Sequence, residues 1–296
     1  MPELPEVETV RRGLAPVMEN SVLARVEARR KDLRFPFPDS FRERLEGRKI
    51  NSLWRRAKYL VADVEGDELL VMHLGMSGSF RVEGPGLASQ PGGFAHEKGR
   101  DERHDHVVFH LHGNGASSRV IYNDPRRFGF MMLVAKEGWQ ERAPFASLGM
   151  EPTGNSLDAS AISGIMAGKN APLKAALLDQ RLIAGLGNIY VCEALWQAGL
   201  SPRRAAGTIG SKGNRAMTRC DALATSIRDV IARAIDAGGS TLRDHRLTDG
   251  SLGYFQHSFN VYDREGEACR KPGCGGRIER MEQSGRSTYW CASCQR

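Results

Sequence analysis

Four cysteines near the end of the chain have the spacing of a metal site. Cys269 and Cys274 form a C-x4-C pair, and Cys291 and Cys294 form a C-x2-C pair. Four thiolates from two such pairs can surround Zn²⁺ tetrahedrally, which is the arrangement of a zinc ribbon. A segment this short has little core of its own, so metal binding would supply much of its folding free energy. The spacing therefore predicts one structural zinc ion, and four unrelated thiols are the alternative.

Two other short motifs contain residue types that bind phosphate. Gly185-Leu186-Gly187-Asn188 stands where a helical pattern begins, and the N–H groups and dipole of a helix N-terminus attract anions. Taken alone, this motif indicates only a tight turn. Arg286 lies in Ser284-Gly285-Arg286-Ser287, the predicted turn of the ribbon hairpin. There it could reach a groove or a phosphate, or it could be a solvated turn arginine.

The composition fits a globular protein with a polyanionic partner. Of the 296 residues, 41% are hydrophobic and 26% are charged, which excludes a disordered or fibrous protein. The net charge of +7 suits nucleic acid, although many basic proteins bind none. No uncharged run approaches the roughly 18 residues that span a bilayer, and MPELPEVETV lacks the pattern of a secretory signal. We therefore expect a soluble cytoplasmic protein without a disulfide framework.

The first half of the chain has the pattern of a β-domain preceded by one helix. Acidic residues followed by Val7, Val10, Leu14 and Val17 predict a helix over residues 3–20. From Val22 to about residue 135 the pattern changes to alternating or β-branched segments, which predict antiparallel strands. These segments are Lys49–Trp54, Tyr59–Val64, Glu68–His73, His106–His112 and Arg119–Tyr122.

The second half of the chain has helical periodicity. The helical patterns cover residues 158–167, 172–179, 188–198 and about 211–237. Between the strands, the glycine-rich stretch 84–103 predicts a long surface loop, and residues 151–157 predict an interdomain linker. The predicted domains are a β-domain at 2–150, a helical domain at 158–262 and a zinc ribbon at 263–296.

Six motifs follow one another along the chain. They are PELPEVET after Met1, Arg55-Arg56-Ala57-Lys58-Tyr59, His73-Leu74-Gly75-Met76-Ser77-Gly78, Asp124-Pro125-Arg126-Arg127-Phe128-Gly129, Gly185-Leu186-Gly187-Asn188-Ile189-Tyr190 and the four-cysteine ribbon. Together they resemble the formamidopyrimidine-DNA glycosylases, a bacterial family of base-excision repair enzymes. The resemblance runs from Pro2 to the last residues. The related endonuclease VIII branch begins with a different tetrapeptide and lacks the DPRRFG segment, so it is the lesser alternative.

Two features depart from the family pattern. The stretch 84–103 is longer than the family usually has there, and the first cysteine pair is C-x4-C where many members have C-x2-C. The first departure lengthens a loop and the second widens one zinc knuckle. Neither affects the residues that carry the chemistry.

The resemblance implies an α+β fold and a repair activity. The expected fold is an N-terminal β-sandwich with a flanking helix, a helix–two-turns–helix domain that binds DNA, and a C-terminal zinc ribbon, with DNA crossing the cleft between them. The expected enzyme is a monomer that acts on damaged double-stranded DNA and not at a membrane. It would excise oxidised purines and then nick the strand, as a glycosylase and AP lyase.

The resemblance also implies a catalytic set that begins at the N-terminus. Pro2 would be the nucleophile once Met1 is removed, because a secondary α-amine has a pKa of about 8 and is partly neutral at pH 7. Glu3 would be the general acid/base. Lys58, which lies between basic and apolar neighbours and is predicted to sit in a strand, would reach the lesion and the adjoining phosphate. Arg286 completes the predicted catalytic set.

Other family positions would hold the DNA after the damaged base has left the stack. Met76 would intercalate, while Arg126 and Phe128 would probe the opposite strand. The implied phosphate contacts are His104, Arg127, Lys174 and Asn188. Taken alone, Met76 and Phe128 would more often belong to a core.

A zinc-ribbon DNA-binding protein without catalysis is the competing hypothesis. It would explain the charge, the ribbon and the helical domain, but not PEL at the N-terminus or Lys58. Segment 238–254 matches the part of the family that closes over the flipped purine, without individual base contacts being predicted. The relative preference for 8-oxoguanine and formamidopyrimidines stays open.

Overall fold

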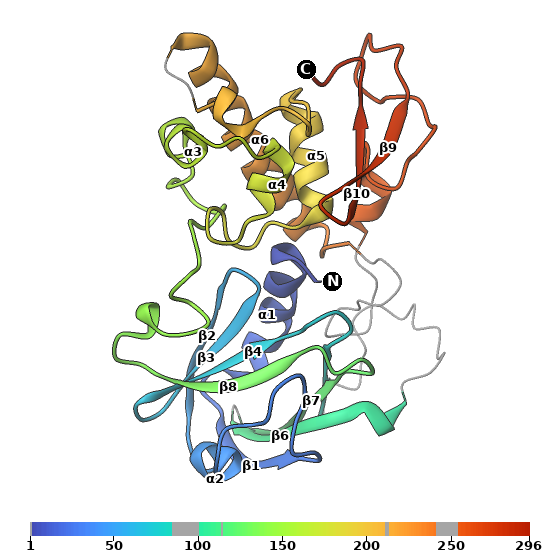
Figure 1. Ribbon diagram of the computed structural model, residues 1–296. Coiled ribbons are helices and arrows are strands. Elements are labelled where there is room, and N and C mark those ends of the chain that lie inside the picture. Colours follow the sequence, from blue (N-terminus) through green and yellow to red (C-terminus); the bar gives the residue numbers. More distant parts are fainter. Residues whose placement is uncertain (1, 85–100, 114, 211–212, 241–253) are drawn as a thin grey trace. The chain divides into compact units, whose positions relative to one another are not determined.

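The chain forms two compact units, which we describe separately. The computed structural model describes residues 2–84, 101–113, 115–210, 213–240 and 254–296. Unit 1 comprises Met1–Ala146 with Ala237–Tyr254, and unit 2 comprises Ser147–Asp236 with Phe255–Arg296 (Figure 1). The described residues 237–240 and Tyr254 thus group with the N-terminal unit. The sequence-based domain boundaries stay a prediction.

Helix α1 (Leu4–Met18) opens unit 1, where residues 3–20 predict a helix. Its first turn is stabilised because the carboxylate of Glu6 accepts a hydrogen bond from the backbone N–H of Glu3, at 2.8 Å. One face of the helix is buried through Val7, Val10 and Leu14, and the helix packs against strand β2 (Ile50–Arg56). The apolar spacing of the sequence therefore becomes the buried face.

Unit 1 contains two antiparallel sheets of four strands each (Figure 1). One sheet has the order β1-β6-β7-β5, and the other has the order β2-β3-β4-β8. The strands are β1 (Val22–Ala28), β2 (Ile50–Arg56), β3 (Tyr59–Val64), β4 (Glu68–His73), β5 (Ser79–Glu83), β6 (Asp105–Gly113), β7 (Ala116–Asn123) and β8 (Phe130–Ala135). A short helix, α2 (Phe41–Leu45), lies between β1 and β2.

The two sheets and α1 share one hydrophobic core. It includes Leu60 and Leu70 from one sheet, Phe109 and Val120 from the other, and Leu14 of α1. Each of these side chains is nearly or fully inaccessible to solvent. The predicted β-sandwich with a flanking helix is confirmed, because both sheets bury one face against the same apolar layer.

Unit 2 combines helices with a β-hairpin. Helix α6 packs against α3 and α5, and the two strands of the hairpin pair antiparallel from Arg286–Gln283 to Cys291–Ile278. The elements are α3 (Ala159–Met166), α4 (Leu173–Leu178), α5 (Asn188–Ala198), α6 (Asn214–Asp236), β9 (Ile278–Gln283) and β10 (Arg286–Cys291). The helical domain and the C-terminal finger are therefore both present, as the α+β prediction requires.

Glu193 of α5 holds the chain that leads into the hairpin. Its carboxylate is buried and accepts hydrogen bonds from the backbone N–H groups of Asn260, Val261 and Tyr262, at 2.9–3.0 Å. The side-chain amide of Asn260 donates to the same carboxylate at 3.0 Å. Several donors on one carboxylate satisfy its buried charge and fix the course of the segment.

Some predictions differ from the structure or lie outside its described residues. Strands β1, β5 and β8 lie within the region predicted to form antiparallel strands, but none of them was predicted as a separate segment. β5 (SFRVE) alternates over only five residues, and β8 (FMMLVA) is a continuous apolar run. Most of the predicted loop 84–103 lies outside the described residues, although Glu102–His104 forms a short 3₁₀ helix. Among the described residues, no helix combines the length and the apolar character that crossing a bilayer requires.

Replacing Glu193 tests the importance of this buried carboxylate. We expect Glu193→Gln to lower the free energy of unfolding by about 2 kcal/mol, because an amide group replaces one acceptor and leaves buried N–H groups unsatisfied. The measurement is urea unfolding followed by the fluorescence of Trp196. Glu267→Gln is the control, since Glu267 is more than half exposed, and it should change stability by less than about 0.5 kcal/mol. Equal stability of both variants would contradict the role of Glu193.

Candidate functional site

A cluster of buried acidic groups surrounds the start of α1. Pro2 is buried, Glu3 is only 4% exposed and Glu6 is 2% exposed. Glu6 is the centre of this cluster, because its second oxygen accepts from the backbone N–H of Ser240 at 2.8 Å and from the Ser240 hydroxyl at 3.0 Å. The same carboxylate therefore ties residue 240, at the start of the undescribed segment 241–253, to the helix that begins beside Pro2.

Gly239 allows this close approach. Its φ is +79°, and a Cβ built there would lie 3.0 Å from Oε1 of Glu6. A side chain at this position would strain the backbone and crowd the carboxylate. The rest of the predicted purine-covering segment lies outside the described residues.

Lys58 lies in a hairpin turn, not within a strand as the sequence pattern indicated. Arg56 and Tyr59 pair directly across β2 and β3, so Ala57 and Lys58 form a two-residue turn. Ala57 has a φ of +51°, which reverses the chain there. The ammonium-bearing side chain is nevertheless 8% exposed, and so it is held within the unit.

Arg55 connects this turn to α1. Its Nη1 donates to the carbonyl oxygen of Ala57 at 2.8 Å, and its Nε lies 3.4 Å from the carboxylate of Glu8. Glu8 also accepts from Arg11, at 2.9 Å. Burial raises the pKa of Glu8, but hydrogen bonds and charges from Arg11, Arg12 and Arg55 outweigh this and lower it overall. The turn that carries Lys58 is thus anchored to the helix that follows Pro2.

Asp124 organises the two loops that carry the predicted wedge residues. It is fully buried, and its carboxylate accepts from the hydroxyl of Ser77 at 2.5 Å and from the backbone N–H of Gly129 at 2.9 Å. The Ser77 hydroxyl in turn accepts from the backbone N–H of Arg126 at 3.1 Å. The β4–β5 loop and the β7–β8 loop therefore share one buried anion.

His73 fixes the turn before Met76. Its Nδ1 accepts from the backbone N–H of Gly75 at 3.1 Å, and its ring stacks on Phe130. Burial, and then the positive charges of Lys58 and Arg34, lower the pKa of His73 to about 4. The imidazole is therefore neutral at pH 7, which this acceptor role requires.

The three wedge residues lie on these two loops. Phe128 is 42% exposed, and the guanidinium of Arg126 lies over its ring, with 4.9 Å between the guanidinium carbon and the ring centroid. Met76 and Arg126 also line a cavity of about 580 Å³, together with His73. The structure therefore brings the predicted wedge residues together. An exposed aromatic ring under a cation is also suited to stack on a base.

Two of the predicted phosphate contacts lie close to the wedge loops. Arg127 is exposed, with a φ of +54°, and its Nη1 lies 3.6 Å from Asp32. His104 is half-buried, with its Nε2 3.7 Å from the carboxylate of Asp101. Both side chains are accessible, and their phosphate contacts stay a prediction.

The four ribbon cysteines fit a zinc ion. Their sulfur atoms lie within 4.8 Å of one another, with 3.8 Å between Cys269 and Cys294 and 3.7 Å between Cys274 and Cys291. A tetrahedron with Zn–S bonds of about 2.3 Å places its sulfurs about 3.8 Å apart. Trp196 of α5 donates from Nε1 to the sulfur of Cys269 at 3.3 Å, which is the kind of outer contact that orients a ligand.

Lys174 and Asn188, two of the predicted phosphate contacts, donate to the hairpin in this structure. Lys174 is 0% exposed, and its ammonium donates to the Thr288 hydroxyl at 2.6 Å and to the Ser287 carbonyl oxygen at 3.2 Å. The side-chain amide of Asn188 donates to the same carbonyl at 2.9 Å. The phosphate contacts of both residues stay a prediction.

Arg286 is exposed and begins strand β10, whereas the sequence pattern had placed it within the turn. Ser284 and Gly285 alone form the turn, with φ values of +54° and +70°. At the beginning of α5, Gln180 shapes the preceding turn by accepting from the N–H of Gly185 and donating to the carbonyl of Leu186. The helix N-terminus at Asn188 is thus preserved as a candidate anion site.

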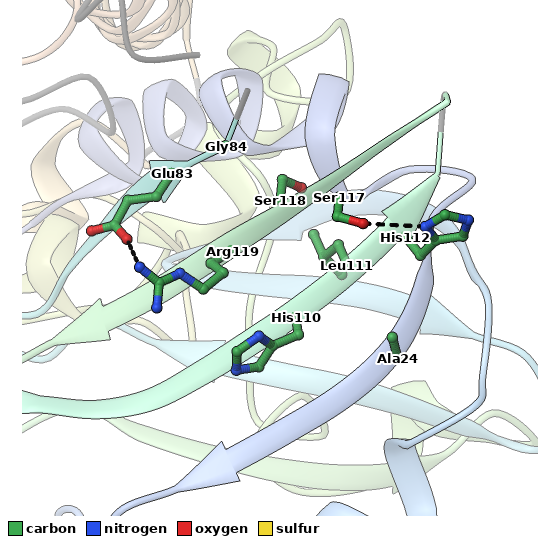
Figure 2. Close-up of a pocket in the computed structure, with 9 residues that line it drawn as sticks. All are labelled: Ala24, Glu83, Gly84, His110, Leu111, His112, Ser117, Ser118 and Arg119. Atoms are coloured by element: carbon green, nitrogen blue, oxygen red, sulfur yellow. Dashed lines mark hydrogen bonds and ion pairs between the residues drawn. The ribbon is translucent and has the colours of Figure 1, made fainter. Parts of the chain in front are cut away.

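A second cavity, of about 570 Å³, lies over the sheet β1-β6-β7-β5 (Figure 2). His110 and His112 of β6 line it. Its charged groups are already matched, because Glu83 pairs with Arg119, and His110 lies 2.9 Å from Glu27. We therefore place no functional site there.

Sequence reasoning did not assign roles to three residues that hold the site. His73 and Asp124 lie inside two of the motifs, yet nothing in the motifs shows that one accepts from Gly75 and the other joins two loops. Arg55 likewise stands within a quoted motif. A buried polar residue next to glycine-rich turns is the signal that could have drawn attention to them.

Three domain families match consecutive parts of the chain. The formamidopyrimidine-DNA glycosylase N-terminal domain matches residues 1–131, and the formamidopyrimidine-DNA glycosylase H2TH domain matches residues 148–246. The zinc finger found in FPG and IleRS matches residues 266–296.

Curated relatives and solved structures agree with these matches. The chain is 61% identical over 296 residues to the formamidopyrimidine-DNA glycosylase of Sinorhizobium fredii, and 62% identical over 297 residues to that of Mesorhizobium japonicum, covering all of both chains in each case. It is similar to a Lactococcus lactis FPG mutant in complex with a Fapy-dG-containing DNA, with 31% identity, full coverage of both chains and a TM-score of 0.82. It is also similar to the FPG protein of Thermus thermophilus, with 38% identity, 99% and 98% coverage and a TM-score of 0.79.

The zinc site can be tested by removing one ligand. We expect Cys291→Ser to lose its bound zinc, because three thiolates and a hydroxyl no longer match the metal's preference. The variant should also lose most DNA binding while unit 1 stays folded. Cys220→Ala is the control, since Cys220 is a buried thiol that donates to the carbonyl of Ile209. Metal analysis with full zinc and unchanged DNA affinity in Cys291→Ser would rule the site out.

The neutral His73 predicts a pH dependence of stability. Its folded-state pKa of about 4 lies below its ordinary value of 6.5, so the unfolded chain binds a proton that the folded chain does not. The free energy of unfolding should therefore decrease as the pH falls from 6.5 to 4, by up to about 3 kcal/mol. His73→Gln retains an acceptor for Gly75 but does not titrate. Urea unfolding at several pH values should show a shallower slope for this variant, and equal slopes would contradict the assignment.

Proposed function

The chain belongs to the formamidopyrimidine-DNA glycosylase family, whose members are DNA glycosylases and AP lyases of base-excision repair, and from this premise we propose a mechanism for its own residues. Pro2 attacks C1′ of an oxidised purine nucleotide in duplex DNA, with Glu3 as general acid/base and Lys58 at the lesion. The observation that carries this proposal is the burial of Glu3 directly beside Pro2 at the amino end of α1.

Pro2 can act as a nucleophile only with a free amine, so Met1 must be removed. The lone pair of the amine forms a bond to C1′, and the bond from C1′ to the base nitrogen breaks with its electron pair going to the base. The leaving base takes up a proton. The Pro2 nitrogen then loses the proton that it carried as an amine, and its lone pair forms the C=N bond of a cationic iminium while the bond from C1′ to the sugar-ring oxygen breaks and that oxygen takes up a proton. The iminium draws electrons from C2′ when a proton leaves that carbon. Loss of the 3′ phosphate and then of the 5′ phosphate follows, and the strand is nicked.

Glu3 is suited to move the protons in these steps. Its backbone N–H is held by Glu6, so its position at the start of the helix is fixed. We assign to Glu3 the protonation of the sugar-ring oxygen and the removal of protons from the sugar.

Lys58 is held in a position that suits contact with the lesion. The two-residue turn and the contacts of Arg55 restrict the backbone around it. Its positive charge acts on His73, whose pKa it helps to lower, and His73 supports the turn that carries Met76. Lys58 and the wedge loop therefore lie in one region of unit 1. There the protein would stabilise both the flipped nucleotide and the gap that this nucleotide leaves in the duplex.

The wedge residues would stabilise the DNA after base extrusion. Met76 fills the gap between neighbouring bases, and Phe128 supports the kink by partial stacking. Arg126 carries donors that can pair with the acceptors of the orphaned base. The rigid frame around Asp124 supports this role, because an inserted side chain must hold its place against the stacked bases.

Contacts to the DNA backbone are assigned to both units. In unit 2, the N-terminus of α5 and the exposed Arg286 are suited to bind phosphate. In unit 1, Arg127 and His104 are the accessible candidates. The net charge of +7 supports strong dependence of binding on salt. We further propose that the protein acts as a monomer in the bacterial cytoplasm, since one chain carries every residue assigned here.

Borohydride trapping tests the nucleophile. The reagent reduces the iminium and should fix the protein covalently to a duplex that contains 8-oxoguanine, with the adduct mapped to Pro2 by mass spectrometry. A form that retains Met1 should bind the duplex but neither nick nor crosslink, because its Pro2 nitrogen is in an amide. Glu3→Gln should bind with similar affinity but excise the base about 10²–10⁴ times more slowly.

Two controls separate the roles. Pro2→Gly should keep some trapping, because a primary amine still forms an imine. Lys58→Ala should slow excision of the oxidised purine more than cleavage of a preformed abasic site. An adduct that maps to Lys58 would overturn the assignment, and absence of any nicking by the processed protein would favour a DNA-binding protein without catalysis.

A further inference from the structure

Lys174 places an ammonium group in the interior of unit 2. It belongs to the first turn of α4, yet its side chain is 0% exposed. Its ammonium donates to two acceptors of β10, the hydroxyl of Thr288 at 2.6 Å and the carbonyl oxygen of Ser287 at 3.2 Å. Burying an ammonium is unfavourable unless its hydrogen bonds are well made. These contacts therefore constrain the position of β10 relative to α4.

Asn188 adds a second tie to the same carbonyl. Its Nδ2 donates to the oxygen of Ser287 at 2.9 Å and lies 3.5 Å from the hydroxyl of Tyr262. Its Oδ1 is buried and has no hydrogen-bond partner among the described residues. A rotated amide would set this oxygen against the carbonyl of Ser287, so the observed orientation is the one that the hairpin dictates.

The hairpin needs such hydrogen bonds to hold its position. It has only two strands, and an isolated two-stranded hairpin is marginally stable in water. The zinc ligands lie at the far end of β10 from its turn, with Cys291 as its last residue and Arg286 as its first. Lys174 and Asn188 act at Ser287, next to Arg286, where the metal does not restrain the chain directly.

A short hydrogen-bond chain extends from Lys174 to the turn. Thr288 is fully buried, and its hydroxyl also lies 3.4 Å from Oε1 of Gln283 across the hairpin. The Nε2 of Gln283 in turn donates to the carbonyl oxygen of Pro202 at 3.2 Å. The tip of the hairpin is thus docked to the helical part of unit 2 through polar contacts on both strands.

We infer that Lys174 is a positioning residue, which holds the hairpin tip in place and so presents Arg286 to the DNA backbone. This inference rests on the proposed function, in which Arg286 contacts a phosphate. This positioning role differs from a direct phosphate contact by Lys174. A fully buried ammonium that donates to β10 has its donors directed into the protein and not toward DNA. Loss of Lys174 should act through Arg286.

Two substitutions at Thr288 separate positioning from direct contact. Thr288→Val keeps the shape of the side chain but removes the hydroxyl that accepts from Lys174 at 2.6 Å, whereas Thr288→Ser keeps the hydroxyl. Thr288 is buried and cannot touch DNA itself. We expect Thr288→Val to weaken duplex binding nearly as much as Arg286→Ala does, and to lower the salt slope by about 1. Thr288→Ser should bind like the unchanged protein.

A double-mutant cycle checks the route of the effect. In the Arg286→Ala background, Thr288→Val and Lys174→Met should each weaken binding by less than about twofold further, because residues that act through one contact are not additive. Lys169→Met, the same chemical change elsewhere in unit 2, serves as the charge control. Additive losses for Lys174→Met, combined with normal binding by Thr288→Val, would show a direct phosphate contact and overturn the inference.

Hydrogen exchange in the free protein provides a measurement without DNA. The backbone amides of β10 should exchange about tenfold faster in Thr288→Val than in Thr288→Ser, with zinc content unchanged. Equal protection in the two variants would overturn the positioning role. If Arg286→Ala leaves DNA binding unchanged, the proposed phosphate contact of Arg286 fails, while hydrogen exchange still decides whether Lys174 holds the hairpin.

Discussion

Buried carboxylates that accept backbone N–H groups determine where the working loops of this protein lie. Glu6 binds the start of α1 and residue 240, Asp124 binds the two wedge loops, and Glu193 binds the segment before the hairpin. A carboxylate removed from water must be satisfied, so each one accepts from several donors at once. The segments that donate to it lose their freedom together. Each buried carboxylate thus fixes the positions of several separate segments of the chain together.

This arrangement allows exposed side chains to be rigid. Phe128 and Arg126 face solvent, and such side chains are usually mobile because little packs against them. Here the backbone on either side is bound to Asp124, directly or through Ser77. Less ordering is then required when DNA binds, and more of the interaction energy appears as affinity. Lys174 shows the same principle with opposite charge.

The sequence predicted the elements and the chemistry better than it predicted the contacts. Apolar spacing predicted α1 and α5, and the cysteine spacing predicted the metal site, because both depend on local periodicity. The site residues came from motifs, which state residue types but not partners. Nothing in the sequence distinguishes Lys174 from a surface lysine, and only the structure shows that it is buried and donates to Ser287 and Thr288 of β10. Lys58 was placed in a strand because Ala57 has no propensity for the positive φ that makes the turn.

The turn at Ala57 and Lys58 restricts how this gene product can vary in length. Arg56 and Tyr59 are already paired across the strands, so no spare residue separates the end of β2 from the beginning of β3. One inserted residue would relieve Ala57 of its left-handed conformation, but it would also enlarge the turn and displace Lys58. Deletions are equally intolerable there, because two residues are the shortest connection that such hairpins commonly use. Insertions and deletions should therefore accumulate in other hairpins of the sheet, while the two-residue spacing between β2 and β3 is retained.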